Sequence, residues 1–160
     1  MSAREIGAGN ACVIGAAGST KHKGEGDRAT PLGSFALRRL WYRPDREAHP
    51  ISPLPIEAIT PQCGWADDPD DRHYNQAISL SRLSRYPYRY ETLWRQDHLY
   101  NLFFELGYND APIIKGAGSA IFLHLAPKDT KPTEGCVGVS RTIMADIIAR
   151  ATKNSFIHIT

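Results

Sequence analysis

The sequence predicts a mainly β fold with a few helices, in a single domain that covers residues 1–160. A chain of 160 residues, 42% of them hydrophobic, has the usual size of one domain with its own core. Short apolar runs alternate with segments rich in glycine and proline, which is typical of strands joined by turns and loops. A helical spacing of apolar residues is clear only near the carboxyl end.

In the first half of the chain the expected strands are short and far apart. "NACVIG" (residues 10–15) is an apolar run closed by a glycine and predicts a strand. "GSTKHKGEGDRATPLG" (18–33) is rich in glycine, proline and charge and predicts a loop. "SFALRRLWY" (34–42) begins with alternating apolar residues and predicts a second strand. Residues 44–69 hold six prolines and little periodicity, so an irregular insertion is expected there.

The clearest strand of the chain is "GSAIFLHLAP", residues 118–127. It follows "HLYNLFFELGYN" (98–109), which predicts a strand ending in a turn. A strand turns successive side chains to opposite faces. The period of two therefore separates two sets of residues: Ala120, Phe122 and His124 on one face, and Ile121, Leu123 and Leu125 on the other.

The carboxyl end combines two strands and the expected helix. "CVGV" (136–139) predicts a short strand, and "SFIHIT" (155–160) predicts a closing one. Between them, Ser140 is suited to cap a helix that runs to about residue 152. The helix would carry an apolar stripe along one side, made of Ile143, Met144, Ile147 and Ala151.

Charge and hydropathy exclude several classes of function. The net charge is +2 and the basic residues are scattered, so neither a nucleic-acid partner nor an anionic membrane is indicated. The longest apolar run, "AIFL", is far too short to span a bilayer. The first residues lack a basic segment followed by a long apolar stretch, so a cytoplasmic protein is expected, or a periplasmic one if a signal was removed. We expect a monomer.

Cysteines and histidines indicate neither a disulfide framework nor a metal site. The chain has three cysteines and no CxxC pair, and we interpret Cys12 and Cys63 as structural. Five histidines lack the spacing of metal ligands: His22, His49, His73, His98 and His158.

Cys136 and His124 are the candidates for chemistry. Each alone is more typical of a buried structural residue. Together they suit nucleophilic catalysis, because a thiol needs a base within hydrogen-bond reach. His124 ends one predicted strand and Cys136 begins the next, so an eleven-residue connection can place them side by side on one sheet. Gly135 permits a close backbone approach, and the N–H groups of Gly135 and Cys136 are candidates for an oxyanion hole.

The segment "GSAIFLHLAPKDTKPTEGCVGVS" resembles the catalytic segment of the L,D-transpeptidases, the YkuD-like cysteine enzymes of bacterial cell-wall metabolism. In that family a histidine at a strand end precedes a loop and a Gly-Cys pair. The resemblance covers roughly residues 15 to 145. "KGEGDRATPLGSF" is similar to the family's early segment, which contains glycine and Thr-Pro. Three further stretches are similar to a compact bacterial branch of the family: "GWADDPDDRHYNQ", "DHLYNLFFELGYN" and "GAGSAIFLH".

The resemblance implies a β-sandwich-like catalytic domain that acts on peptidoglycan tetrapeptide stems. Cys136 would attack the carbonyl at the L-centre of the diamino acid in position three and release D-Ala. His124 would be the base, oriented by a backbone carbonyl, and the acyl group would pass to an amine or to water. The family needs no metal and no organic cofactor, and its nucleophile is acylated by carbapenems.

The same resemblance suggests substrate-binding residues, all taken from the matching stretches, for each of which a purely structural role is an equal alternative. They are Tyr74, Asn75, His98, Tyr108, Asn109, Gly118, Ser119 and Glu134.

Two departures from the family pattern bear on substrate recognition. Glu134 stands where a histidine is usual, and would raise the pKa of the thiol if its side chain turned inward. Gly138 stands where an arginine is usual, which removes a carboxylate clamp. Four cations could replace that arginine: Arg72, Lys115, Lys128 and Arg141.

Three hypotheses of function follow. The first is an L,D-carboxypeptidase that trims D-Ala from muropeptides during recycling in the cytoplasm. The second is a transpeptidase that makes 3–3 cross-links or exchanges D-amino acids. The third is a non-catalytic module that binds the wall. The first hypothesis is favoured by the expected absence of a signal peptide and by the presence of Glu134. The third is weakened because both Cys136 and His124 are present.

Overall fold

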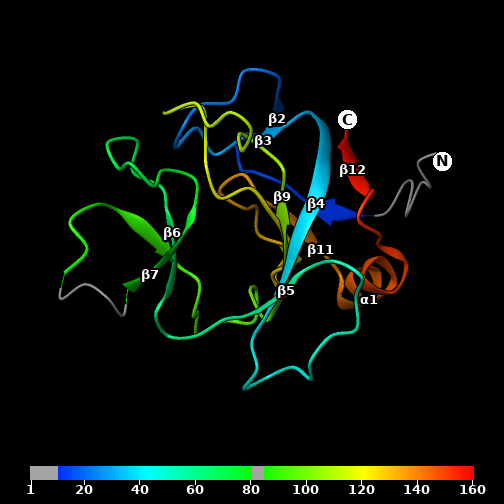
Figure 1. Ribbon diagram of the computed structural model, residues 1–160. Helices are drawn as coiled ribbons and strands as arrows, with labels where there is room; N and C mark the ends of the chain where they lie inside the picture. Colours follow the sequence, from blue (N-terminus) through cyan, green and yellow to red (C-terminus); the bar gives the residue numbers. More distant parts are fainter. Residues whose placement is uncertain (1–10, 81–84) are drawn as a thin grey trace.

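The computed structural model describes residues 11–80 and 85–160 and is built mainly of β-strands (Figure 1). In chain order the elements are β1 (Cys12–Val13), β2 (Ser19–Thr20), β3 (Thr30–Pro31), β4 (Gly33–Tyr42), β5 (Ile56–Ala58), β6 (Cys63–Ala66), β7 (Ala77–Ser79), β8 (Tyr90–Thr92), β9 (Leu102–Leu106), β10 (Phe122–Leu125), β11 (Val137–Val139), α1 (Arg141–Arg150) and β12 (Phe156–Ile159). Within the described residues, α1 is the single α-helix.

A seven-stranded sheet is the frame of the fold. Its strand order is β1-β11-β10-β9-β4-β12, and β5 pairs with β4 beside this path. The long strand β4 pairs with β12 through its first half and with β9 through its second half, with a register shift between Leu37 and Arg39. Strands β10 and β11 are parallel neighbours, although only the segment between Ala126 and Cys136 connects them. Because the strands are parallel, this segment must return along the sheet: Ala126 lies beside Val139, and Cys136 lies beside Phe122.

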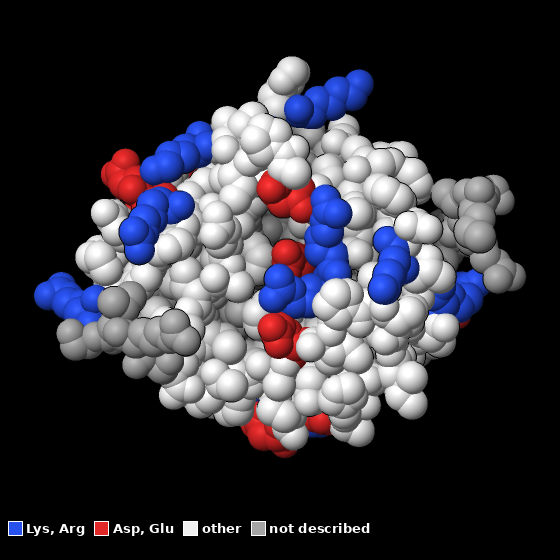
Figure 2. Space-filling view, viewed as in Figure 1, with Lys and Arg blue, Asp and Glu red and all other residues white. Residues whose placement is uncertain are grey.

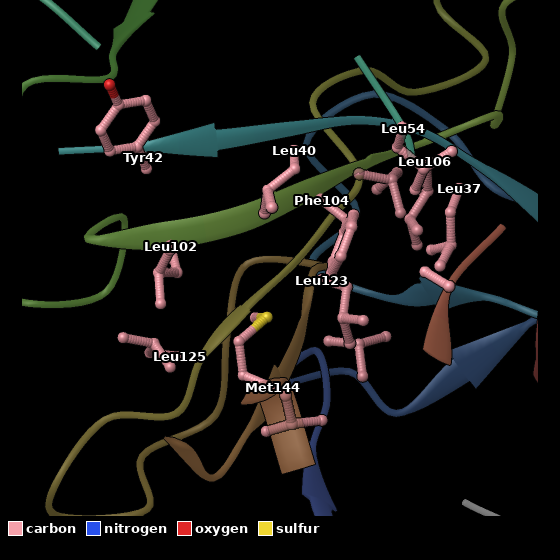
Figure 3. Packing of buried hydrophobic residues seen from close by; sticks show 14 residues of the cluster. Leu37, Leu40, Tyr42, Leu54, Leu102, Phe104, Leu106, Leu123, Leu125 and Met144 are labelled. Atoms are coloured by element: carbon pink, nitrogen blue, oxygen red, sulfur yellow. The ribbon is translucent and has the colours of Figure 1, made fainter. Parts of the chain in front are cut away.

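Helix α1 covers one face of the main sheet. Ser140 is its N-cap, and the Ser140 hydroxyl accepts a hydrogen bond from the backbone N–H of Ile143 at 3.2 Å. Met144 is fully buried and packs among leucines of β4, β9 and β10 (Figure 3). Leu123 and Leu125 of β10 point into this same core. The helix therefore holds the sheet from the side opposite to Cys136.

A second core fills the other face of the sheet, toward the three-stranded sheet β7-β6-β8. Phe122 of β10 has no exposed surface and meets Trp65 of β6 edge to face, with ring centroids 5.0 Å apart. The rings of Tyr100 and Phe103 also contact the Phe122 ring, edge-on and tilted respectively, and Cys136 belongs to this cluster. Figure 1 shows β6 and β7 on one side of the long strand β4 and helix α1 on the other.

The structure confirms the fold class, the strand at residues 34–42, the two faces of residues 120–125 and the capped helix after Ser140. The strand expected at 118–127 is limited to Phe122–Leu125, and the strand expected at 98–109 is limited to Leu102–Leu106. The strand expected at 10–15 is shorter, and its first residue lies outside the described residues. Two predictions were wrong. The loop at 18–33 contains the parallel pair β2 and β3, and the expected irregular insertion at 44–69 contains β5 and β6.

The misplaced elements share one physical property. Strands β5 to β8 have three or four residues each and are stabilised by pairing with distant partners. Such short strands carry little periodic signal of their own. In the described residues, no helix is long and apolar enough to cross a membrane.

Met144→Ala should lower the free energy of unfolding by about 2–5 kcal/mol, because it leaves a cavity between α1 and the sheet. Urea denaturation followed by circular dichroism measures this change. Ile51→Ala is the matched control: Ile51 is 92% exposed, so its loss should change stability by less than about 0.5 kcal/mol. Equal stability of the two variants would contradict the assignment of Met144 to the core.

Candidate active site

A cavity of about 430 Å³ opens where the loop after β2, the strand β8 and the segments around β10 and β11 meet. This volume suits a small ligand or the end of a peptide. Seven charged side chains line its wall, three basic and four acidic: Lys23, Arg89, Arg95, Glu25, Asp67, Glu91 and Glu134. Acidic and basic side chains alternate along a hollow in the middle of the face shown in Figure 2. The wall also includes Cys136 and His124.

Cys136 lies immediately before β11, and glycine precedes it for a steric reason. Gly135 has a φ of +138°, and a Cβ atom there would lie 3.0 Å from the carbonyl oxygen of Ala29. The Cys136 sulfur accepts a hydrogen bond from the N–H of Phe122 at 3.3 Å and donates one to the carbonyl of Ala120 at 3.1 Å. The thiol is thus held against β10 in its protonated form.

His124 lies on the same face of the sheet as Cys136, on the adjacent strand. His124 is paired in register with Gly138, two residues beyond Cys136. Its Nδ1 lies 2.8 Å from the carbonyl oxygen of Leu125. Because a carbonyl can only accept, Nδ1 carries the proton and Nε2 is the basic nitrogen. The orientation by a backbone carbonyl that the family resemblance implied is therefore present.

Gly138 lies beside the imidazole of His124. A Cβ atom at position 138 would lie 3.6 Å from Cε1 of His124, an ordinary van der Waals distance, and 3.2 Å from Cα of Ala126, which is a tight contact. The backbone of Ala126, and not the histidine ring, therefore favours glycine at this position.

Burial keeps both candidate catalytic groups neutral. Desolvation, followed by the negative charge of Glu91, raises the pKa of Cys136 to about 12. Desolvation also lowers the pKa of His124, against the effect of its bond to Leu125. At neutral pH the pair is therefore a thiol and an imidazole rather than a thiolate and an imidazolium. For the Cys136 sulfur to act as a nucleophile, its proton would have to move to a base, and His124 is the candidate.

Tyr100 and Glu91 form a polar wall beside this pair. The Tyr100 hydroxyl donates to Oε1 of Glu91 at 2.5 Å, and its ring meets the His124 ring at a centroid distance of 5.5 Å. Arg95 lies over the Tyr100 ring at 5.0 Å and 3.8 Å from Glu91. Sequence analysis missed these three residues, since nothing local in "YETLWRQDHLY" indicates that they face Cys136.

Among the predicted binding residues, Ser119 and Glu134 line the cavity. Ser119 donates to Oε2 of Glu25 at 2.8 Å. Glu134 is turned away from the nucleophile: its carboxylate accepts from Nε of Arg28 at 2.8 Å, and its side chain is 77% exposed. The inward orientation considered from the sequence is therefore wrong, and Glu134 has no part in the raised pKa of Cys136.

Tyr74 and Asn75 support the cavity from behind. The Tyr74 hydroxyl accepts from the N–H of Gly118 at 3.0 Å and donates to Glu25. Asn75 is buried with a φ of +57° and uses both ends of its amide. It accepts from Trp65 and from the N–H of Ala120, and it donates to the carbonyls of two residues in the 108–109 turn. Asn75 thereby positions the strand that leads to His124.

The other predicted binding residues lie outside the cavity wall. Asn109 ties its own loop together through bonds to Ile114 and Gly118, and Tyr108 donates to the carbonyl of Ala117 at 2.5 Å. His98 lies 3.0 Å from the carbonyl of Ala126 through Nε2. Their hydrogen bonds support structural roles, in line with the structural alternative that the sequence left open.

Gly118 and Gly135 pack closely around Lys23. A Cβ atom on Gly118 would lie 2.9 Å from Cγ of Lys23.

The N–H of Gly135, a candidate oxyanion donor, lies 3.2 Å from the hydroxyl oxygen of Thr133. The contribution of this N–H to an oxyanion hole therefore stays a prediction, and it would require exchange of that bond.

The cations expected to replace the family arginine are not the ones at the site. None of the four candidates is on the described cavity wall, and Arg141 instead pairs with Glu47 at 2.6 Å. The cations that line the wall are Lys23, Arg89 and Arg95. In the described parts of the chain, no group of three metal-ligating side chains is arranged to hold an ion.

Glu91→Gln should lower the pKa of Cys136, because it removes a negative charge that raises it. The rate at which iodoacetamide alkylates Cys136 reports the fraction of Cys136 in the thiolate form. It is measured from about pH 7 to pH 10 by mass spectrometry of the peptide that contains Cys136. The parent rate should rise with pH without a plateau, and the variant should react faster at each pH. The exposed control Glu57→Gln should match the parent. An equal or slower rate in Glu91→Gln would contradict this electrostatic coupling.

Comparison with known proteins agrees with the resemblance seen in the sequence. A model of the family YkuD, described as the L,D-transpeptidase catalytic domain, matches residues 4–159. No curated protein and no solved structure gives a significant match. The family consists of cysteine-dependent acyl-transferases that act on peptidoglycan peptides. The match covers nearly the whole chain, and the fold places a cysteine and a histidine on one face of adjacent strands. The protein therefore belongs to the L,D-transpeptidase catalytic domain family.

Proposed function

We propose that this protein is an L,D-carboxypeptidase that removes D-Ala from peptidoglycan tetrapeptide stems through an acyl-enzyme on Cys136. The observation that carries the proposal is the placement of Cys136 and His124 on one face of the parallel pair β10 and β11, at the wall of a cavity. The proposed substrates are muropeptides in recycling, and the proposed location is the cytoplasm.

The proposed reaction uses His124 in both directions. As the Cys136 sulfur attacks the carbonyl at the L-centre of residue three, Nε2 of His124 takes the thiol proton. The carbon–nitrogen bond to D-Ala then breaks, and His124 returns the proton to the leaving amine. Water attacks the thioester with His124 again as base, which releases the tripeptide and restores the thiol. Neutral resting forms of both groups suit this sequence.

The charges of the cavity favour hydrolysis over transfer to a wall acceptor. Each cation on the wall already has an acidic partner: Lys23 bonds Asp27 at 2.5 Å, Arg89 bonds Asp67 at 3.0 Å and Arg95 bonds Asp97 at 2.6 Å. Carboxylates of an incoming acceptor would have to compete with these pairs. Water meets no such competition.

The alternative function is transpeptidation, and a second hollow is the observation in its favour. It has a volume of about 520 Å³ and is lined by β1 and by residues on both sides of β11. Pro132 lies on the walls of both cavities, so the two hollows adjoin. A second stem could occupy this hollow while the first is held as a thioester.

Cys136→Ala should abolish turnover without loss of the fold. In the parent protein, mass spectrometry should detect a carbapenem or substrate adduct on Cys136, with Cys12 and Cys63 unmodified.

His124→Ala should slow acylation by about 10²- to 10⁴-fold, the usual contribution of a positioned base. An adduct confined to Cys12 or Cys63 would refute the nucleophile, and unchanged acylation in His124→Ala would refute the base.

The products of a tetrapeptide muropeptide separate the two functions. The carboxypeptidase should yield tripeptide and free D-Ala, with little 3–3 dimer even at high substrate, because its acyl-enzyme passes to water. Chromatography with mass detection measures these species. Excess D-methionine supplies a small competing amine. If dimers or stems carrying D-methionine exceed tripeptide, transpeptidation or exchange replaces hydrolysis as the function.

A further inference from the structure

Glu25 differs from the other acidic residues on the cavity wall because it forms no ion pair with a basic side chain of the described residues. Its carboxylate oxygen Oε2 accepts hydrogen bonds from the hydroxyls of Tyr74 and Ser119, the latter at 2.8 Å. No lysine, arginine or histidine of the described residues forms an ion pair with it, and Oε1 has no hydrogen-bond donor among them. One oxygen is therefore anchored and the other is unpaired.

The neighbouring cations are bonded to acids other than Glu25, although the charge of Glu25 also acts on Arg89 and raises its pKa, behind the larger effect of its bond to Asp67. Lys23, two residues away in sequence, is committed to Asp27 and to the carbonyl of Gly24. Arg89 bonds Asp67 through both its side chain and the Asp67 carbonyl. The charge of Glu25 nevertheless reaches this pair, because it contributes to a raised pKa of Asp67, behind the larger effect of burial.

Glu25 is close to the nucleophile through the segment that leads into β10. Ser119 bonds Glu25, and the next residue, Ala120, accepts the hydrogen bond from the Cys136 thiol. Glu25, Ser119, Ala120 and Cys136 all line the same cavity. If the carbonyl group of a substrate lies against Cys136, the substrate groups next to that carbonyl therefore lie near Glu25.

The hydroxyl donors make the carboxylate a preorganised acceptor. Tyr74 is buried, with 1% of its surface exposed, and is itself fixed by the N–H of Gly118. Two donors on one oxygen hold the carboxylate plane without neutralising its charge. A primary ammonium group has three N–H donors and no acceptor, which fits the remaining oxygen. A neutral amide in the same position would gain less, and a carboxylate would be repelled.

We propose that Glu25 binds the side-chain ammonium group of the third stem residue and so selects stems with a free diamino acid side chain. The inference rests on the proposed function, since it assigns the residue that Cys136 acylates. An attacking acceptor amine is a poorer occupant, because it must lose its charge to react and a carboxylate stabilises the charged form. The side-chain ammonium of the donor stays charged throughout, so this ion pair persists in the thioester.

The test compares stems that differ at one amine. Tetrapeptides with lysine at position three are prepared with the side-chain amine free or acetylated, because the lysine side chain ends in an ammonium group without a carboxylate. D-Ala release gives kcat/KM, and calorimetry with the Cys136→Ala variant gives binding without turnover. The parent should prefer the free amine by about 10- to 100-fold, the usual effect of a charge-assisted hydrogen bond. This preference should fall at high salt.

Glu25→Gln should treat the free and acetylated stems alike, since it keeps an acceptor oxygen for Tyr74 and Ser119 but has no charge. The control Glu57→Gln, at an exposed glutamate that pairs with Arg39, should keep the full preference. Loss of preference in Glu25→Gln with its retention in the control supports the ammonium site. A preference that survives in Glu25→Gln overturns it.

Failure of the inference can be told from failure of the proposed function. If the parent cleaves free and acetylated stems equally, the ammonium site is wrong and the carboxypeptidase stands. If stems bind with the Glu25-dependent preference but no D-Ala is released, the ammonium site stands and the proposed reaction is wrong. If no stem binds to Cys136→Ala, the ammonium site is refuted whatever the turnover.

Discussion

The parallel pairing of β10 with β11 is the constraint on which the site depends. Because Leu123 faces Val137 and His124 faces Gly138, Cys136 falls beside Phe122 and on the same face as the imidazole. A shift of one residue would turn one of the two side chains into the opposite core, since strands alternate their faces. The leucine core under helix α1 therefore fixes the register by which the two reactive groups meet.

Burial has opposite effects on the two groups, and both effects favour the neutral state. The same desolvation raises the pKa of the Cys136 thiol and lowers that of His124. The bond from the thiol to the Ala120 carbonyl is consistent with a protonated sulfur. Such a pair is protected from adventitious reaction at rest, because the thiolate is the reactive form. In the proposed reaction, the thiol proton moves to His124 only as the sulfur attacks a carbonyl group.

Most charged side chains of the cavity wall are in ion pairs, and Glu25 is the exception among the described residues of the wall. Three basic residues each have an acidic partner, whereas Glu25 is held only by neutral hydroxyls. Paired ions line a polar cavity with little net attraction for further ions, but an unpaired and anchored carboxylate attracts a cation. Under the proposed function, recognition would depend on a charge of the ligand that pairs with Glu25, while the chemistry would depend on Cys136 and His124, which burial keeps neutral.

The sequence by itself determined the mainly β class, the two faces of residues 120–125, the helix capped by Ser140 and the association of Cys136 with His124, because each follows from local periodicity or from a compact motif. Only the tertiary structure decided that Glu134 turns outward to Arg28 and that Glu91, Tyr100 and Glu25 line the cavity. These residues come from loops and short strands, whose positions are set by pairing with distant segments and not by their own sequence.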